Sequence, residues 1–406
     1  MEYILSLLKE ISIENHIEIY IVDGYLVDKV LNRETKNIKI LVKGNKKELV
    51  NILSNSTEKI KLTDGNISYN DIELNIESIN KNIEEELLDR HFTIEAVAID
   101  IKDYMDLNKI IDPLDGLKDI KNNIIKHTSK KLLKNPINLL RAIKLMAKYR
   151  FKLCDKTKNI IINNKILLTN ICSKDIGEEV LNILSYKDSY YYFRYMEYEL
   201  NILEFIFPEI ETMRDVGECK YHVVDALTHS IYTLKTVENI IYTDGYFEKH
   251  IREEYEKYSQ KRVYKNHSRL QLIKLAAFFH DVGKPAARWV DETGRTRFRG
   301  HEKVGADMIK DIAIRFGLSK KEQDILYNIV LHHMIPLVLY KKNDLSNKNL
   351  IEAFNKMESE TLDILLIALA DIIATRKLLN PEEPMEKFKI HIEYIVSNYL
   401  TRYKNR

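Results

Sequence analysis

The sequence predicts an α+β N-terminal part, in which helices accompany a mixed sheet, followed by two all-α parts. Short apolar runs separated by turn residues occupy the chain up to about residue 125, and from about Ser129 onward long helical periods replace them. Glycine (12) and proline (7) are scarce among the 406 residues, which favours long helices. We therefore place a head at residues 1–128, a helical neck at 129–215 and a C-terminal helical domain at 216–406.

The predicted elements of the head follow from apolar periodicity and from turn residues. We expect a helix over 1–15, strands over 17–22 and 38–42, a helix over 25–31, a hairpin within 60–76 and a strand over 92–101. A turn follows at Asp112-Pro113-Leu114-Asp115-Gly116. In the neck, Pro136 suits a helix start, and the segment 242–268 reads as exposed helix or an insertion.

The overall composition narrows the possible partners. Lys+Arg number 63 and Asp+Glu 61, for a net charge of +2, so any nucleic-acid binding must rest on a local basic patch. Cys154, Cys172 and Cys219 form no CxxC pair, which indicates a reduced, cytoplasmic protein. No apolar run approaches the roughly 20 residues that span a bilayer, and the first helix carries no signal-peptide cleavage site. We therefore expect no membrane partner.

The strongest chemical signal is the heptapeptide Phe279-His280-Asp281-Val282-Gly283-Lys284-Pro285. An adjacent His-Asp pair at the end of an apolar helix can ligate metal, and the carboxylate of Asp281 can bridge two cations. Gly283 relaxes the chain, so that Lys284 returns towards the site and could contact an anionic phosphate. We name Lys284 and Asp281 as catalytic candidates.

Further potential metal ligands lie before and after this heptapeptide in the chain. They are Asp225 and His229, four residues apart, then His301, His332, His333 and Asp371, while His222 is a weaker candidate. A lone buried histidine is more often a core residue than a ligand, but a buried carboxylate such as Asp371 is costly without a partner. Imidazole and carboxylate together suit manganese, iron, cobalt, nickel or zinc better than calcium. We expect two such divalent ions and leave open whether His332 or His333 is the ligand.

This series resembles the HD superfamily of metal-dependent phosphohydrolases over residues 216–375. The resemblance implies that His229, His280, Asp281 and Asp371 form the core metal site, and that His301 with His332 or His333 adds a second metal. It also matches Lys284 to the lysine of the family's HDxGK motif. An HD phosphohydrolase acting on nucleotide or RNA-end phosphoesters is therefore our leading hypothesis.

The first 150 residues resemble the bacterial tRNA nucleotidyltransferase and poly(A) polymerase family. The family's GG-x-VRD turn is represented by Val22-Asp23-Gly24-Tyr25-Leu26-Val27-Asp28, and its DxD by Asn37-Ile38-Lys39. Its RRDFTINA is represented by Asp89-Arg90-His91-Phe92-Thr93-Ile94-Glu95-Ala96, and its EDxxR by Lys134-Asn135-Pro136-Ile137-Asn138. The segment 111–119 and residues 139–144 match the family well.

The departures fall on the residues that would contact metal, ribose and base. A lysine at position 39 repels the cation that a carboxylate would bind there. Because four motifs depart while the fold-keeping residues stay, we predict that the head is an inactive nucleotidyltransferase-like domain. The resemblance also implies that the neck lies near tRNA, so tRNA is a possible partner.

Two basic segments have open interpretations. Arg141, Lys144, Lys148 and Arg150 recur near helical spacing and form either an RNA-binding face or a solvated helix face. The single Trp289, with arginines at 288, 295, 297 and 299, belongs either to a lid that contacts phosphate or stacks a base, or to a polar β-hairpin.

Two further hypotheses differ in class from the leading one. The first is a tRNA CCA-adding nucleotidyltransferase or poly(A) polymerase. Incorporation of CTP or ATP into tRNA would support it. The second is a non-catalytic RNA-binding or regulatory protein with structural metals. A nucleotide or an RNA 3′ end is the expected substrate under the leading hypothesis, and the sequence leaves the oligomeric state open.

Overall fold

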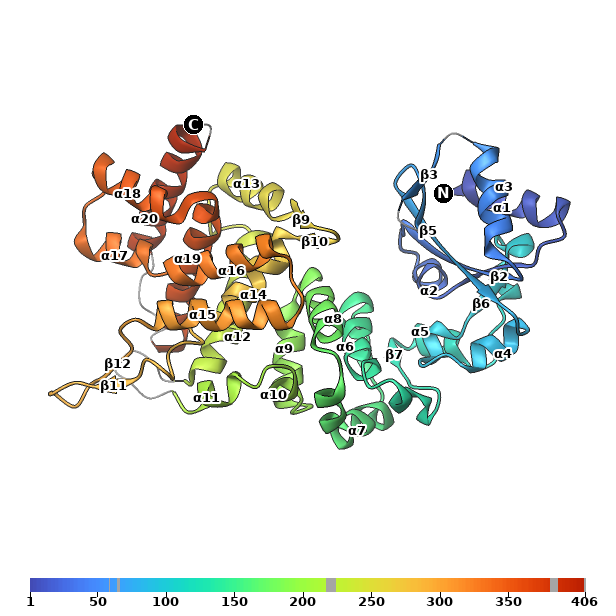
Figure 1. The fold of residues 1–406 in the computed structure, drawn as a ribbon, viewed down its shortest axis with the longest axis horizontal. Helices are drawn as coiled ribbons and strands as arrows, with labels where there is room; N and C mark the ends of the chain where they lie inside the picture. Colours follow the sequence, from blue (N-terminus) through green and yellow to red (C-terminus); the bar gives the residue numbers. More distant parts are fainter. Residues whose placement is uncertain (58, 64–65, 217–223, 380–385, 405–406) are drawn as a thin grey trace. The chain divides into compact units, whose positions relative to one another are not determined.

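The computed structural model describes residues 1–57, 59–63, 66–216, 224–379 and 386–404. The chain forms two compact units, Met1–Asn164 and Lys165–Arg406 (Figure 1). The first unit holds a mixed sheet with helices and the second is helical, so the predicted fold class is confirmed. The division between the units falls inside the predicted neck.

A six-stranded sheet forms the centre of the first unit. In spatial order its strands are β3 (Ile60–Thr63), β4 (Asn66–Tyr69), β5 (Ile72–Ile79), β2 (Asn37–Lys43), β1 (Ile19–Val22) and β6 (Ala98–Asp100). Strands β2 and β5 are parallel, and the other neighbours are antiparallel. The predicted strands at 17–22 and 38–42 and the predicted hairpin are therefore present.

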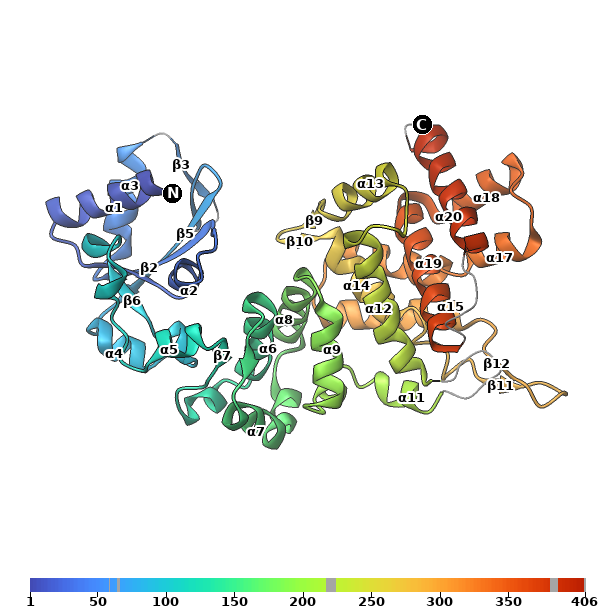
Figure 2. The ribbon, with the colours of Figure 1, turned by 180° about the vertical axis from the view of Figure 1, so that it is seen from behind.

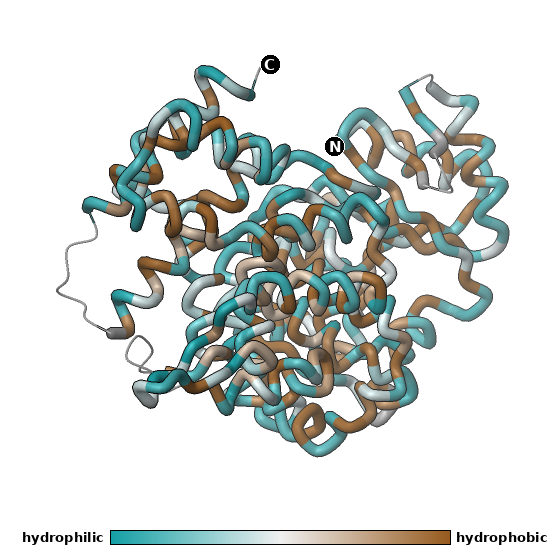
Figure 3. Tube along the Cα trace, turned by 60° about the vertical axis from the view of Figure 1, so that its left-hand side comes forward, coloured by the Kyte–Doolittle hydropathy of each residue, from teal (hydrophilic) through white to brown (hydrophobic). Residues whose placement is uncertain are grey.

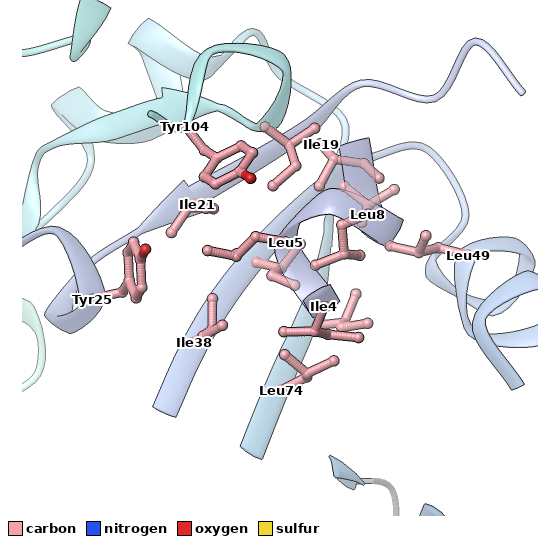
Figure 4. Close-up of a cluster of buried hydrophobic side chains, with 14 of the residues drawn as sticks. Ile4, Leu5, Leu8, Ile19, Ile21, Tyr25, Ile38, Leu49, Leu74 and Tyr104 are labelled. Atoms are coloured by element: carbon pink, nitrogen blue, oxygen red, sulfur yellow. The ribbon is translucent and has the colours of Figure 1, made fainter. Parts of the chain in front are cut away.

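Both faces of this sheet are covered, which explains the unbroken apolar run of β1. Side chains alternate along a strand, so Ile19 and Ile21 enter one core while Tyr20 and Val22 enter the other. The first core is closed by α1 (Glu2–Glu14) and α3 (Lys46–Ser56), whose buried leucines and isoleucines meet the sheet in Figure 4. The second core is closed by α4 (Ile83–Leu88), by Ala96, and by the partly buried Ile111 and Leu114.

Short helices complete the first unit. They are α2 (Gly24–Val30), the 3-10 turns Ile101–Asp103, Leu107–Lys109 and Lys130–Lys134, α5 (Gly116–Lys121), α6 (Asn138–Tyr149) and α7 (Asp155–Asn163), with strands β7 (Ile124–Ile125) and β8 (Lys152–Leu153). Pro136 precedes the first turn of α6 and does not lie inside it.

The predicted strand over 92–101 is wrong for its first half. Thr93 to Glu95 form a 3-10 turn, and only Ala98–Asp100 pair in the sheet. The cause is a tertiary contact, because the Thr93 hydroxyl donates to Asp119 Oδ2 at 2.7 Å and fixes the turn against α5. The predicted turn at 112–116 supports the same contact. A Cβ at Gly116 would lie 2.1 Å from the Thr93 carbonyl oxygen, so only glycine fits there.

The second unit is built from packed helices with two small hairpins. Its elements are the 3-10 turn Lys165–Asn170, α8 (Ser173–Ser185), α9 (Ser189–Tyr198), α10 (Leu203–Ile206), α11 (Ile210–Arg214), α12 (Ala226–Tyr242), α13 (Lys249–Ser259), β9 (Arg262–Tyr264), β10 (His267–Ser268), α14 (Arg269–Phe279), β11 (Trp289–Val290), β12 (Thr296–Arg297), α15 (His301–Arg315), α16 (Lys320–His332), α17 (Ile335–Lys342), α18 (Asn347–Met357), a turn at Glu358–Glu360, α19 (Thr361–Leu379), α20 (Glu386–Asn398) and a π turn at Tyr399–Tyr403. Figure 2 shows the same helices from behind.

Helix α14 is the central element of the second unit. All eleven of its residues are buried, and it packs against α8, α12 and α16. Most of the other helices are amphipathic, so hydrophobic and hydrophilic stretches alternate along the tube in Figure 3.

An aromatic cluster fixes the C-terminal end of α14. The ring of Phe278 lies 4.9 Å from Phe193 and 5.8 Å from Phe207, and Phe207 also contacts Phe279 and Phe316. Tilted and edge-on contacts of this kind add to the stabilisation from burial. The cluster therefore anchors the residues that immediately precede His280.

The segment 242–268, predicted as an exposed helix or an insertion, is not an exposed helix over its whole length. It contains α13 and a short hairpin, and Tyr255 of α13 is fully buried, stacked on Phe247 at 5.3 Å. The Tyr255 hydroxyl donates to the Leu362 carbonyl oxygen at 3.0 Å. The abundance of charged residues in this segment concealed the few that pack.

No helix in the described part of the chain is long and apolar enough to cross a membrane.

We expect Phe278→Ala to lower the free energy of unfolding by about 3–5 kcal/mol, because it removes a buried ring from the aromatic cluster. The control Ile314→Ala changes a residue on the exposed side of α15 and should alter the free energy of unfolding by less than about 0.5 kcal/mol. Chemical unfolding of the full chain measures both. Equal losses for the two variants would contradict the assigned core.

Candidate functional site

Five helices bring a buried cluster of histidine and aspartate side chains together. The cluster consists of His229 from α12, His280 and Asp281 at the end of α14, His301 at the start of α15, His333 at the end of α16 and Asp371 from α19. The ligand-type atoms of His229, His280, Asp281 and Asp371 lie within 4.8 Å of one another, as do those of Asp281, His301 and His333. Asp281 belongs to both groups, so its carboxylate can bridge two cation positions.

Backbone carbonyls orient three of these imidazole rings. The Nδ1 atoms of His280, His301 and His333 donate to the carbonyl oxygens of Ala277, Phe298 and Val330, at 2.9, 2.8 and 2.6 Å. A carbonyl can only accept, so Nδ1 carries the proton in each ring and Nε2 is left with its lone pair. Each Nε2 then faces the interior of the cluster, which is how metal-binding histidines are commonly held.

The inward-facing atoms fit a cation. The Nε2 atom of His280 is buried without a hydrogen-bond partner among the described residues, although it lies 3.2 Å from Asp281 Oδ2 and 3.7 Å from Asp371 Oδ1. His301 Nε2 lies 3.3 Å from Asp281 Oδ1 and 3.3 Å from His333 Nε2. Lone pairs at such distances repel unless a proton or a metal ion lies between them.

The charges of the cluster point to the same conclusion. Burial disfavours a protonated His280, but Asp281 and Asp371 outweigh burial and raise its pKa to about 10. Burial and the neighbouring His280 and His301 lower the pKa of His333 to about 3. Burial alone would raise the pKa of Asp281 and Asp371, yet their histidine partners hold both well below the usual value. These shifts show that the carboxylates and imidazoles of the cluster favour a positive charge between them.

Two predicted ligands do not belong to this cluster. Asp225 precedes α12 with extended backbone angles, so the helical spacing to His229 does not apply to it. Its two carboxylate oxygens instead cap the helix, accepting from the Thr228 amide at 2.8 Å and the Thr228 hydroxyl at 2.7 Å. His332 is half-buried and lies in neither group, whereas His333 lies in one. The weaker candidate His222 lies outside the described residues, as does Cys219.

Lys284 differs from its predicted role as a phosphate contact. Its ammonium lies 2.5 Å from Asp281 Oδ2 and 5.9 Å from the centre of the Phe298 ring, in a buried position. In this structure the lysine therefore neutralises the shared carboxylate.

Gly283 explains why the His-Asp pair and the start of α15 meet so closely. A Cβ at Gly283 would lie 2.2 Å from the His301 carbonyl oxygen and 2.5 Å from the Gly305 amide nitrogen. The two backbones are in direct contact, and only glycine permits that approach. This contact sets the position of His301 relative to Asp281.

A second site is a polar pocket in the first unit. It has a volume of about 300 Å³ and is lined by Gly24, Tyr25, Asn37, Ile38, Lys39, Glu73, Leu74, Asn75 and Lys148. The lining comes from the edge where α2, β2 and β5 meet, so it includes the positions that the family resemblance assigns to the DxD motif.

An ion-pair network holds Lys39 beside this pocket. The ammonium lies 3.3 Å from Asp23 Oδ2 and 3.1 Å from Glu77 Oε2. Asp23 adopts φ 57° and ψ −133°, a conformation that glycine favours. The backbone therefore keeps the conformation of the family's glycine pair, although an aspartate occupies the first position. Its carboxylate also faces Arg90 at 3.5 Å.

Two of the basic residues of α6 are engaged within the first unit, so the basic residues form neither a continuous RNA-binding face nor a continuous solvated face along the helix. Arg141 donates to the buried Glu95 at 2.8 Å, and the half-buried Lys148 reaches the pocket beside Gly24. Burial lowers the pKa of Lys148, which Asp28 and Glu95 partly offset.

The sequence analysis missed Glu73, Asn75 and the pocket role of Lys148. Glu73 and Asn75 occupy alternate positions of β5 that face away from the core, and the register Asn37↔Glu73 and Lys39↔Asn75 brings them beside β2. The alternation was visible, but the parallel pairing that aligns the two strands was not.

The fold and the two sites define a protein with a nucleotidyltransferase-type head and a helical unit centred on a histidine-aspartate cluster. Residues 66–126 match the model of the poly(A) polymerase head domain, and residues 227–376 match that of the HD domain. The predicted resemblance is confirmed: a poly(A) polymerase head and an HD domain are matched in one chain, and its relatives and structural neighbours include CCA-adding enzymes.

Relatives share low identity over much of the chain. The multifunctional CCA protein of Pseudoalteromonas atlantica is 25% identical over 72% of this chain and 66% of its own length. That of Mannheimia succiniciproducens is 22% identical over 71% of this chain and 64% of its own length. The chain thus matches slightly less than two thirds of these relatives.

Solved structures are similar across both units. A tRNA-processing enzyme shares 16% identity and a TM-score of 0.65 over 99% of this chain and 91% of its own. A CCA-adding enzyme solved with CTP shares 16% identity and a TM-score of 0.62, over 100% of this chain and 82% of its own. A tRNA nucleotidyltransferase solved with a primer tRNA and an ATP analogue reaches 0.64 at 16% identity, over 97% of this chain and 99% of its own. At this identity they establish the fold.

The leading prediction, an HD phosphohydrolase with an inactive head, is wrong. The relatives and structural neighbours are named for CCA addition, and none of these findings indicates that nucleotidyl transfer has been lost or that the HD domain hydrolyses phosphoesters. The prediction inferred loss from substitutions at single motif positions. The structure keeps a polar pocket at positions 24, 37 and 39, where the substituted Lys39 and Asp23 form an ion pair, and the substituted Glu95 pairs with the retained Arg141.

We expect His333→Ala to reduce the divalent metal content of the purified chain by at least half, because it removes a predicted ligand whose ring is oriented by the Val330 carbonyl. The matched control His332→Ala changes the neighbouring histidine and should leave the content unchanged. Elemental analysis after purification with added manganese measures both. Metal loss in the control alone would contradict the choice of His333.

Proposed function

We propose that this chain adds nucleotides to the 3′ end of tRNA. The observation that carries the proposal is a likeness that spans both units, since CCA-adding enzymes solved with CTP and with ATP match 99–100% of the chain. Relatives named as multifunctional CCA proteins and a tRNA nucleotidyltransferase solved with a primer tRNA support the same substrate class. Fold alone does not select a reaction, so the pocket of the head is the second support.

The head pocket offers charges and hydrogen-bonding groups that suit a nucleotide. Lys39 and Lys148 provide positive charge for a triphosphate, and Asn37 and Asn75 can both donate and accept hydrogen bonds. The Lys148 ammonium lies 2.8 Å from where a Cβ at Gly24 would be, so the glycine lets this positive charge lie close to the backbone of the pocket.

The side chains of this pocket do not fit a divalent ion held by the protein alone. Both groups with metal-ligand geometry among the described residues lie in the second unit. The acids Asp23 and Glu77 are already paired with Lys39. We therefore assign no step of the transfer to an ion bound by these residues.

We further propose that the cluster of the second unit holds one or two divalent transition-metal ions. His229, His280, Asp281 and Asp371 would hold one ion, and Asp281, His301 and His333 the other. The combination of imidazole nitrogen and carboxylate oxygen supports manganese, iron, cobalt, nickel or zinc. When bound, such ions polarise phosphate oxygens and lower the pKa of bound water. The expected cytoplasmic location and the division at residues 128 and 215 remain predictions.

The proposal predicts that the full chain transfers labelled CMP and AMP from CTP and ATP to tRNA whose 3′ terminal CCA has been removed. Sequencing gels of the product would show a ladder of added nucleotides. Intact tRNA that already ends in CCA is the control and should gain far less label. Tight tRNA binding without any incorporation would contradict the proposal.

We expect Lys39→Glu to lower kcat/KM for this incorporation at least tenfold, about 1.4 kcal/mol. The change places a third acid beside Asp23 and Glu77, where it repels the triphosphate. The control Lys36→Glu lies outside the pocket, where Lys36 pairs with the exposed Asp71, and should keep most of the activity. Similar activity in the two variants would show that the pocket does not bind the nucleotide.

A further inference from the structure

The hairpin β11–β12 extends from the helices of the second unit as a separate arm (Figure 1). It follows the His-Asp loop and ends at His301, so both of its ends are attached to the histidine-aspartate cluster. Its strands place Trp289 opposite Arg297 and Val290 opposite Thr296. Apolar side chains exposed on such an arm indicate a binding surface, because exposed apolar area is costly in water.

The hairpin carries an exposed apolar pair at its base. Trp289, the single tryptophan of the chain, is 49% exposed, and Val290 is 58% exposed. An indole half in water offers a flat ring face on which a base can stack. No described side chain gives Trp289 a ring contact.

Arginines surround this ring. The side chains of Arg288, Arg295, Arg297 and Arg299 are all exposed. Arg297 donates to Asp291 Oδ2 at 2.8 Å, whereas Arg288, Arg295 and Arg299 form no ion pair within the described parts of the chain. Three exposed guanidinium groups without an ion pair, on the same short hairpin as an exposed aromatic ring, favour an anionic, base-bearing partner.

The pairing of the strands places Trp289 and Arg297 on one face, because cross-strand partners share a face. Arg288 directly precedes β11, and Arg295 directly precedes β12. Arg299 follows two residues after Arg297, beyond Phe298, whose ring centre lies 5.9 Å from the Lys284 ammonium. The three arginines therefore lie next to the strands that carry Trp289.

The turn of the hairpin is rigid before any partner binds. Asp291 Oδ1 accepts from the backbone amides of Thr293 and Arg295, each at 3.0 Å, and Gly294 adopts φ +77°. The Asp291 amide donates to the Arg295 carbonyl oxygen at 2.9 Å. The arm therefore presents its arginines without first having to fold, which reduces the entropic cost of binding.

We propose that the β11–β12 hairpin binds the single-stranded 3′ end of RNA, with one base stacked on Trp289 and backbone phosphates on Arg288, Arg295 and Arg299. The inference rests on the proposed function only in taking RNA as the substrate. It adds a contact in the second unit, whereas the proposed transfer takes place in the head.

The single tryptophan permits a direct test. We expect the fluorescence of Trp289 in the full chain to change on titration with a short single-stranded RNA that ends in CCA, and the change to weaken as salt is raised. Unchanged emission at saturating RNA overturns the proposal. A change with polyglutamate but not with RNA also overturns it, in favour of an acidic polypeptide partner.

Variants separate the hairpin from the rest of the surface. In anisotropy measurements with labelled RNA, Trp289→Ala and the double change Arg295→Ser with Arg299→Ser should each raise Kd about tenfold, and Trp289→Phe should stay within about threefold of wild type because phenylalanine still stacks. The matched controls Arg262→Ser and Tyr264→Ala alter exposed residues of the β9–β10 hairpin and should leave Kd unchanged. Equal Kd values for hairpin variants and controls overturn the proposal.

Failure of this inference is distinguishable from failure of the proposed function. A chain that incorporates CMP and AMP normally but whose hairpin variants bind RNA like wild type overturns the hairpin alone. A chain whose hairpin variants lose RNA binding, but which incorporates nothing, supports the hairpin and overturns the transfer. A chain that binds no RNA overturns both.

Discussion

The second unit depends on one contact, the approach of Gly283 to the backbone at His301 and Gly305. A buried helix delivers His280 and Asp281 to this point, and the absence of a side chain at Gly283 lets α15 begin directly against the loop. The Asp281 carboxylate then lies within reach of histidines from separate helices. A residue larger than glycine would separate the two halves of the cluster, even if every ligand were retained.

The two sites of the chain manage buried charge in different ways. In the second unit, carboxylates face imidazole lone pairs whose other nitrogens are fixed by backbone carbonyls, and this arrangement calls for a cation. In the head, the cation is part of the chain, since the Lys39 ammonium lies between Asp23 and Glu77. A pocket balanced by its own lysine does not need a metal ion to keep these acids close together.

The sequence predicted the elements with a strong local signal and failed where a distant contact decides. The short apolar run of β1 and the His-Asp-x-Gly-Lys loop were sufficient to predict a strand of the sheet and the cluster. The turn at Thr93 depends on Asp119, which lies 26 residues further along the chain, and no local pattern predicts that contact. Asp225 was assigned to a helix face, although it lies one residue before the helix and caps it.

The error about function has a related cause. The replacements at positions 37 and 39 were judged one motif at a time, and each was counted as the loss of a contact. The structure gives the replaced residues partners within the fold, because Lys39 pairs with Asp23 from a second motif and Glu95 from a third motif pairs with the retained Arg141. Substitutions that compensate one another keep a pocket open, and only the three-dimensional arrangement reveals that compensation.

The most direct test of the account is to find where a nucleotide binds in the full chain. Photo-crosslinking with azido-ATP, followed by peptide mapping, distinguishes the two sites. The account predicts labelled peptides from the head pocket, at residues 24–39 or 73–75. Labelling confined to peptides around His229, His280 and Asp371 would contradict it, since the nucleotide would then bind at the histidine-aspartate cluster and not in the head.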